Sequence, residues 1–417
     1  MRFSVVKSTR LSRDMSACSR IGSASRDAVT GRDVGIHHFP EPGFGGTRED
    51  GAWSLHVHRS LDALETLEPA WRRLTSADGA PFQTYSWNLA WYRCFATGEG
   101  IPLIFETRKN GVTAAILPCY FEGRSIRLAG DQTGGRQDVI ALENEAVDAA
   151  LNLSMGWLKG EAKRSDFHFE KLSREGLLFR SLQQSVGSRG ETLKFEEVRS
   201  FIQTVALKGG FEGFLVAQSR ESQQDLREVM IRLEREAPAA RVVKLRDFQV
   251  RVDDLANAAA FHIEHFRKRG VSPFLDQRLF HFLGEIAKDP DVGFQLSCLT
   301  NQGDILAVDF GFLRAGRYYS YLAASDETFA RLEPGKCLLV KRINSWSKVD
   351  GVHALEFPVG DDGYPEGLFA DSVCEVRSIR LMPRDLRNRA RHLRLESNQQ
   401  VRRFARSALE KTAILPR

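Results

Sequence analysis

The sequence has no long hydrophobic run and no start that resembles a secretory signal. None of its apolar stretches approaches the roughly 18 to 20 residues that a membrane-spanning helix needs. The first residues also lack the apolar core of a secretory signal. We therefore expect a cytoplasmic protein, with the surface of the inner membrane as its alternative location.

The spacing of metal-binding residue types argues against a metal centre. The six cysteines are scattered, without a CxxC pair or another short metal-ligand spacing. Small core side chains in a reducing compartment explain them best. His262 and His265 are three residues apart, but the sequence offers no third ligand beside them. We expect no metal cofactor.

Charge of one sign is not in marked excess. The chain carries 59 basic and 54 acidic residues, a net charge of +5, which does not by itself indicate a nucleic-acid partner. Hydrophobic content of 42% and charged content of 27% are ordinary for a globular protein. A length of 417 residues favours two domains with tails.

Composition and periodicity divide the chain into four segments. Residues 1–51, rich in Arg, Ser and Gly, read as a disordered tail, and residues 383–417 as a basic, largely helical tail. Residues 52–200 and 201–382 form two α/β units. In the second unit we expect a charged helix over Phe211–Glu236 and a strand over Val242–Val252.

The most informative stretch runs from Asp304 to Asp350. Two strand-like segments are joined by a turn at Arg314-Ala315-Gly316, and a helical pattern begins near Cys337. Pro334-Gly335 lies between strand and helix. A glycine there lets a ligand approach the backbone, and the N-terminus of the helix behind it can hold a phosphate. The unit therefore reads as strand, anion-binding loop and helix.

Several short motifs, in this order, resemble one family. They are Pro81-Phe-Gln, Leu233-Glu-Arg, His265-Phe-Arg-Lys-Arg-Gly-Val-Ser-Pro-Phe, Tyr319-Ser-Tyr with Asp326, Pro334-Gly335, and Glu356-Phe-Pro-Val-Gly with Tyr364. Over roughly Trp53 to Met382 the chain resembles GNAT-like proteins of the CelD type, which are associated with cellulose and polysaccharide biosynthesis. That family is related to the FemAB-type tandem-GNAT transferases.

The resemblance implies an α/β (α+β) fold of two tandem GNAT-like lobes. Each lobe would be a mixed, mostly antiparallel sheet flanked by helices. It also implies acetyl-CoA or another acyl-CoA as donor, and as acceptor an amine such as an amino sugar or glycan precursor. Tyr318–Ala324 would be the splayed strand that pairs with the donor. The donor-binding residues implied are Tyr321, Leu322, Ala323, Arg331, Pro334, Gly335, Lys336 and Cys337.

Acyl transfer to an amine requires a base, an oxyanion donor and an acid for the leaving thiolate. The candidate bases are Glu356, Asp309 and Asp326, and the candidate acids are Tyr364 and Tyr321. Each of these residues could instead have a purely structural role, as a carboxylate in a salt bridge, as a turn cap, or as a buried tyrosine whose hydroxyl is hydrogen-bonded.

Three residues are candidates for binding the substrate. They are His265 and Arg269, near the end of one predicted helix, and Asp326 at the end of the predicted splayed strand. Cations near a helix C-terminus are the structural alternative for the first two.

Two other functions remain open. A FemAB-like transferase would take its acyl group from aminoacyl-tRNA, and the basic residues after Arg384 could serve that RNA. A non-catalytic scaffold in polysaccharide biosynthesis is the third possibility, because Leu332 and Glu333 interrupt the expected small-residue loop.

Overall fold

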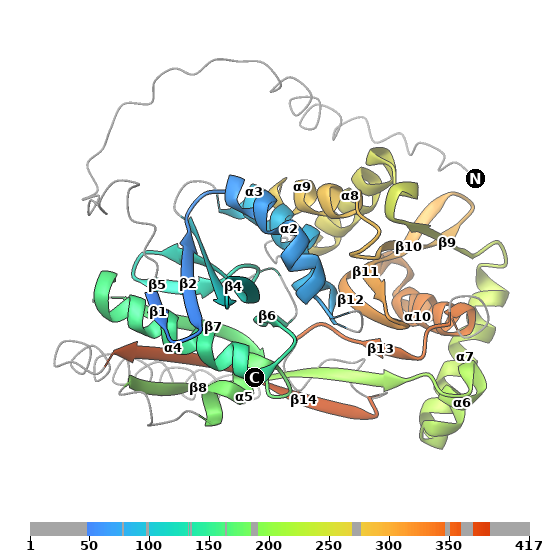
Figure 1. Cartoon of the computed structure of the whole chain (residues 1–417). Helices are drawn as coiled ribbons and strands as arrows, with labels where there is room; N and C mark the ends of the chain where they lie inside the picture. Colours follow the sequence, from blue (N-terminus) through green and yellow to red (C-terminus); the bar gives the residue numbers. More distant parts are fainter. Residues whose placement is uncertain are drawn as a thin grey trace, which may run out of the picture.

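The computed structural model describes residues 48–76, 79–96, 100–131, 133, 136–162, 165–184, 191–268, 277–346, 351–359 and 370–383. Figure 1 shows their course. The elements of the first half are β1 (Arg48–Asp50), β2 (Trp53–His58), α2 (Asp62–Leu74), η2 (Pro81–Gln83), α3 (Tyr85–Phe95), β3 (Ile101–Lys109), β4 (Val112–Glu122), β5 (Ser125–Leu128), β6 (Ile140–Ala141), α4 (Asn144–Glu161), β7 (Asp166–Ser173) and α5 (Leu177–Gln184).

The second half follows without a break in the sheet. Its elements are β8 (Glu191–Ala206), α6 (Gly210–Ala217), α7 (Arg220–Glu236), β9 (Arg241–Arg246), η3 (Asp247–Gln249), α8 (Val252–Lys268), α9 (Gln277–Ile286), β10 (Phe294–Asn301), β11 (Asp304–Arg314), β12 (Arg317–Ser325), η4 (Glu327–Leu332), α10 (Pro334–Ser345), β13 (Ala354–Glu356) and β14 (Ser372–Pro383). None of the described helices combines the length and the apolar character needed to cross a bilayer.

Both halves contain the same unit, which confirms the predicted α/β fold with mostly antiparallel sheet. In the first half β3, β4 and β5 are antiparallel neighbours, and α4 leads to β7, which lies parallel to β5. In the second half β10, β11 and β12 are antiparallel neighbours, and α10 leads to β13, which lies parallel to β12. The hairpins turn where two successive residues have positive φ, at Asn110-Gly111 and Ala315-Gly316.

The two halves exchange their last strands. β8, from the end of the first half, pairs with β13 of the second, and β14 pairs with β7 of the first. β8 and β14 also pair with each other, so that the strands of the described residues form one sheet of 14. In Figure 1 these two strands run along the bottom of the molecule beneath both halves. The predicted lobe boundary after residue 200 therefore falls inside β8, and β1 lies within the segment predicted as a tail.

Two elements of the second half differ from the sequence prediction. The strand expected over Val242–Val252 ends at Arg246, because Asp247 has a positive φ of 44° and opens a helical turn. The helix expected over Phe211–Glu236 is divided in two. Ser219 starts the second piece by accepting a hydrogen bond from the main chain of Ser222 at 3.1 Å.

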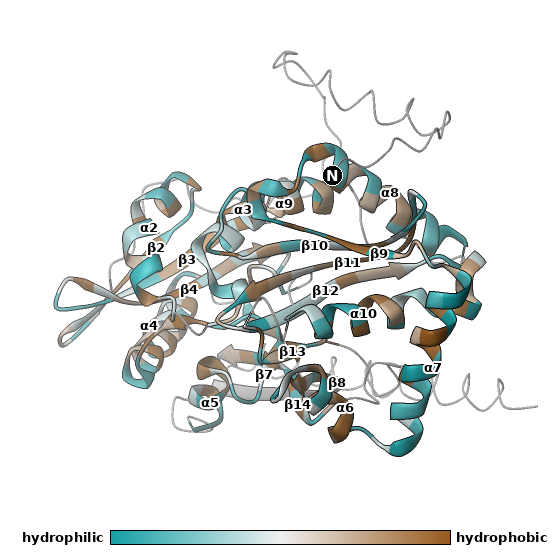
Figure 2. Cartoon of the chain, turned by 90° about the vertical axis from the view of Figure 1, so that its right-hand side faces the viewer, coloured by the Kyte–Doolittle hydropathy of each residue, from teal (hydrophilic) through white to brown (hydrophobic). Residues whose placement is uncertain are grey.

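Helices of the first half pack over the sheet of the second. Phe82 lies edge-on to Phe312 and Tyr319, and Trp87 lies 4.7 Å from Phe282, between ring centroids. These rings belong to one buried cluster that joins α2 and α3 to α8, α9 and β10–β12. In Figure 2, α3, α8 and α9 cover one face of β10–β12, and α10 lies on the other.

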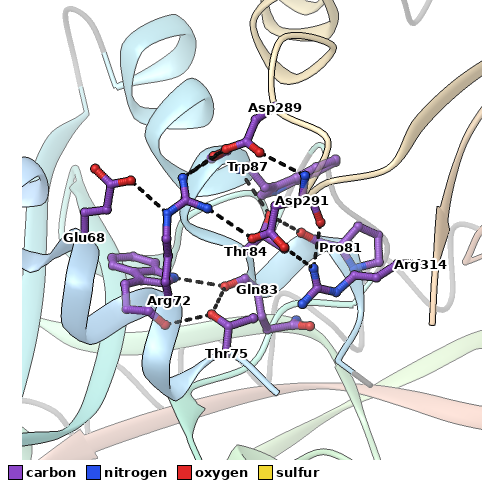
Figure 3. Close-up of polar contacts among 12 residues, drawn as sticks. Glu68, Arg72, Thr75, Pro81, Gln83, Thr84, Trp87, Asp289, Asp291 and Arg314 are labelled. Carbon is purple, nitrogen blue, oxygen red and sulfur yellow. Dashed lines mark hydrogen bonds and ion pairs between the residues drawn. The ribbon is translucent and has the colours of Figure 1, made fainter. Parts of the chain in front are cut away.

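A polar network also joins the two halves (Figure 3). Arg72 of α2 donates to Asp289 at 3.0 Å, and Arg314 of β11 donates to Asp291 and to the carbonyl oxygens of Gly79 and Ser76. Both arginines thus bridge segments more than 200 residues apart in sequence. The apolar cluster and this network fix the two halves relative to each other.

Candidate active site

The parallel strands β12 and β13 diverge after a short paired stretch. They pair at three positions, with Arg317, Tyr318 and Tyr319 opposite Ala354, Leu355 and Glu356. In the described part of the chain, no strand pairs with residues 320–325 on that side of β12. The main chain of β12 therefore presents an unpaired edge that an extended ligand can pair with.

A β-bulge lies where the divergence begins. Phe310 of β11 faces Leu322, whereas Gly311 faces Ser320, so that Tyr321 has no partner across the strand. A bulge of this kind turns the backbone and re-aims the groups next to it. The bulge and the open edge together suit a main-chain donor for an oxyanion, the role expected of the splayed strand.

Tyr321, predicted as an acid and as a donor contact, is held by the first half. Its hydroxyl donates to the carbonyl oxygen of Thr133, and burial raises its pKa. Leu322 and Ala323 follow on the open edge. The other candidate acid, Tyr364, lies outside the described residues.

Glu356 is a buried carboxylate at the last paired position of β13. Only 4% of its surface is exposed, and Oε2 accepts from Arg136 at 3.0 Å and from Arg317 at 3.4 Å. Burial raises its pKa, and the two arginines oppose that effect. Within the described part of the chain, Oε1 accepts no hydrogen bond, so one oxygen is available to a substrate.

Asp309 has different surroundings. It lies on β11, where Oδ1 accepts from Ser320 at 2.7 Å and Oδ2 accepts from Tyr318 and Arg342. Both of its oxygens are therefore occupied. Asp326 accepts from the main chain of Thr328 at 2.9 Å and caps η4, the structural alternative that the sequence left open.

The α10 N-terminus is where we expect a phosphate. Pro334 and Gly335 start the helix, so their neighbourhood carries the free N–H groups of its first turn. A Cβ at Gly335 would meet nothing closer than 3.8 Å, so the fold itself does not require glycine there. Cys337 is buried, which raises its pKa to about 11, and it donates to the carbonyl oxygen of Leu332.

Charges around this helix start are paired among themselves. Lys336 donates to Glu333 at 2.6 Å and to Asp225 at 2.9 Å, and Arg331 pairs with Glu236 at 3.1 Å. Arg232 also lies 3.6 Å from Glu333. An incoming phosphate would have to compete with Glu333 for these cations.

We predict that Glu333→Gln strengthens binding of CoA. Removing the charge releases Lys336 and Arg232 from Glu333, while Lys336 keeps its pairing with Asp225. Exposed pairs of this kind are worth about 0.2–1 kcal/mol, so the Kd should fall by roughly 1.4- to 5-fold. Calorimetric titration with CoA at low and high salt measures this effect, which salt should weaken. Asp304→Asn, the same charge change on a distant hairpin, is the control. Equal Kd values for wild type and Glu333→Gln would show that no phosphate binds beside Glu333.

The predicted substrate residues are only partly described. His265 is buried on α8, with its ring 5.1 Å from that of Phe266. The pKa of His262 is lowered to about 4 by burial and by the neighbouring His265, so the ring of His262 is neutral at neutral pH. Arg269 lies outside the described residues.

Sequence reasoning missed the contribution of the first half. Arg136 follows β5 and reaches Glu356 across 220 residues, while Gln83 donates to the main-chain carbonyl oxygen of Arg136 at 2.6 Å. The Pro81-Phe-Gln motif thus supports the segment that carries Arg136. In the sequence, only the pair Gly134-Gly135 just before Arg136 could have marked this segment as a loop worth attention.

Comparisons with known proteins agree with this geometry. A family model described as "Acetyltransferase (GNAT) domain" matches residues 222–365, less than half of the chain. No curated protein matches. The chain is similar in structure to FemX, with a TM-score of 0.54 and 9% identity over 77% of this chain and 96% of that one. It is also similar to L-PGS from Bacillus licheniformis, with a TM-score of 0.52 and 13% identity over 79% and 94%.

The domain match covers β9 to β13 and the helices between them, which include the divergent strands and the helix start. The second half thus resembles a GNAT acetyltransferase domain over residues 222–365, and the likeness to the two solved structures extends over both halves. These identities are low, so that likeness concerns the fold alone.

Proposed function

We propose that the protein is an acyl-CoA-dependent N-acyltransferase whose active site lies in the second of two GNAT-like lobes, residues 52–200 and 201–382. The observation that carries this proposal is the divergence of β12 from β13, followed after η4 by the N-terminus of α10. The donor's pantetheine would pair with the open edge at residues 320–325. Its diphosphate would meet Pro334, Gly335 and Lys336.

Glu356 is the base that we propose. It lies where the strands part, its pKa is raised by burial, and one of its oxygens is available. It would take the proton of the acceptor amine, directly or through water, and the amine would then attack the thioester carbonyl. Main-chain N–H groups at the bulge would hold the oxyanion, and the thiolate would leave with a proton from a tyrosine, either Tyr321 or Tyr364.

The acceptor would approach from the side where the first half meets β12. Thr133 and Arg136 of the first half contact Tyr321 and Glu356 there, so the first half would shape the acceptor's binding site. An amino sugar or another precursor of an envelope polysaccharide, as in CelD-type proteins, is the acceptor class that we propose. Such an enzyme would work in the cytoplasm, at or near the inner membrane.

A transfer from aminoacyl-tRNA is the second candidate. The observation in its favour is the internal pairing of Lys336 and Arg331, which leaves the α10 N-terminus with little free positive charge for a diphosphate. Thermal-shift measurements with CoA and with tRNA separate the two donors. A shift with tRNA alone would favour the second candidate, and a shift with neither would favour a scaffold.

The test of function is release of free thiol from acetyl-CoA and longer acyl-CoAs in the presence of pooled amines. We expect thiol release that depends on both an acyl-CoA and an amine. Folded protein that releases no thiol from any acyl-CoA would contradict the proposed acyl-CoA-dependent reaction.

A further inference from the structure

The bulge in β12 is held in place from the α10 side of the sheet. Ser320, the residue just before the bulge, donates to Asp309 at 2.7 Å. Tyr318, two residues earlier on the same strand, donates to the other oxygen of Asp309. One carboxylate on β11 thus binds β12 at two points beside the bulge.

Asp309 is itself fixed from α10. Arg342 donates to it and lies against the rings of Tyr318 and Trp346, 4.0 Å and 4.4 Å from their centroids. Only 3% of Arg342 is exposed. Gly311 makes room for this arrangement, because a Cβ there would come within 2.0 Å of the Tyr318 hydroxyl oxygen.

The buried charges need an explanation beyond stability. Desolvation of an ion pair costs several kcal/mol, and apolar side chains of similar volume often stabilise a fold equally well. Within the described part of the chain, every hydrogen bond of the Asp309 carboxylate comes from α10 or from the strand that carries the bulge. Such a set of bonds defines the position of β12 more sharply than apolar packing would.

We propose that Asp309, Ser320 and Arg342 are positioning residues that set the geometry of the bulge, and with it the direction of the main-chain amides that face the acyl carbonyl. This inference rests on the proposed function, since it assigns the bulge to the oxyanion. It gives Asp309 a role other than that of the base, because both of its oxygens are committed to this network.

Ser320→Ala tests the inference with a small change. The first half offers a matched control, because Ser125 on β5 donates to Asp166 at the same distance of 2.7 Å. We expect Ser320→Ala and Ser125→Ala to lower the denaturant midpoint by similar small amounts. Only Ser320→Ala should lower kcat, by roughly tenfold or more, with the Kd for CoA unchanged. Ser320→Thr, which keeps the hydroxyl, should restore kcat.

Hydrogen exchange separates this inference from the proposed function, because it requires no turnover. Amides of residues 317–325 should exchange faster in Ser320→Ala than in wild type, and should be unaffected in Ser125→Ala. Unchanged exchange in Ser320→Ala would overturn the inference even in an active enzyme. Faster exchange with an unchanged kcat would overturn the catalytic part of it. Faster exchange in a protein without any thiol release would instead count against the proposed function alone.

Discussion

Replacing Glu356 by glutamine is expected to lower kcat by roughly 100-fold or more, the usual contribution of a general base. Glutamine keeps the size of the side chain and can still accept from Arg136 and Arg317, but it cannot take a proton from an amine. The Kd for CoA should change little, because the donor would bind along β12 and α10 rather than at this carboxylate. Thiol-release kinetics and calorimetry measure the two quantities.

The raised pKa of Glu356 also sets the sign of the pH dependence. Activity should fall as the pH falls through this pKa, since the protonated acid cannot act as a base. The pH dependence of the free energy of unfolding has the opposite sign. A carboxyl group with a raised pKa in the folded state stabilises the fold below its unfolded pKa, and this contribution is lost as the pH rises through the folded pKa. Glu356→Gln should remove both dependences.

Asp326→Asn is the control for this experiment. Asp326 is the other candidate carboxylate near the end of β12, and it caps η4. We expect its replacement to leave kcat within a few-fold of wild type. A Glu356→Gln variant that folds and turns over at the wild-type rate would refute the assignment of the base. An equal loss of kcat in both variants would point to a general effect of charge removal.

Replacing Arg342 by methionine is expected to destabilise the protein by about 3–5 kcal/mol, the cost of leaving a buried charge without its partner. Arg342 is almost fully buried, and it pairs with Asp309 beside the rings of Tyr318 and Trp346. Methionine fills much of the same space but leaves the carboxylate with Tyr318 and Ser320 only. Denaturant unfolding measures the change in free energy.

A double variant provides the internal comparison. Asp309→Leu combined with Arg342→Met removes both charges, and we expect it to be more stable than Arg342→Met alone. Lys288→Met, which removes an exposed ion pair with Glu285 on α9, should change stability by less than about 1 kcal/mol. If Arg342→Met lowers the free energy of unfolding by no more than Lys288→Met does, the Asp309–Arg342 pair is not a strong buried interaction.

Local sequence features determined most of the second half's central unit. The turn predicted at Arg314-Ala315-Gly316 is present, with positive φ at Ala315 and Gly316. α10 begins at Pro334, three residues before the predicted start near Cys337, because proline suits the first turn of a helix. Alternating and three-to-four-residue patterns of apolar residues predicted most strands and helices within a few residues. These features depend on neighbours in sequence, so the sequence alone was enough to predict them.

The sequence by itself determined most of the helices and strands, and that a helix starts at or near Pro334-Gly335 soon after a strand. Only the tertiary structure decided that β8 and β14 change places between the halves, and that Arg136 reaches Glu356. Apolar periodicity tells which face of a strand is buried, but it does not tell which strand lies beside it. Contacts across some 200 residues depend on how the whole sheet closes, and that is a property of the folded chain.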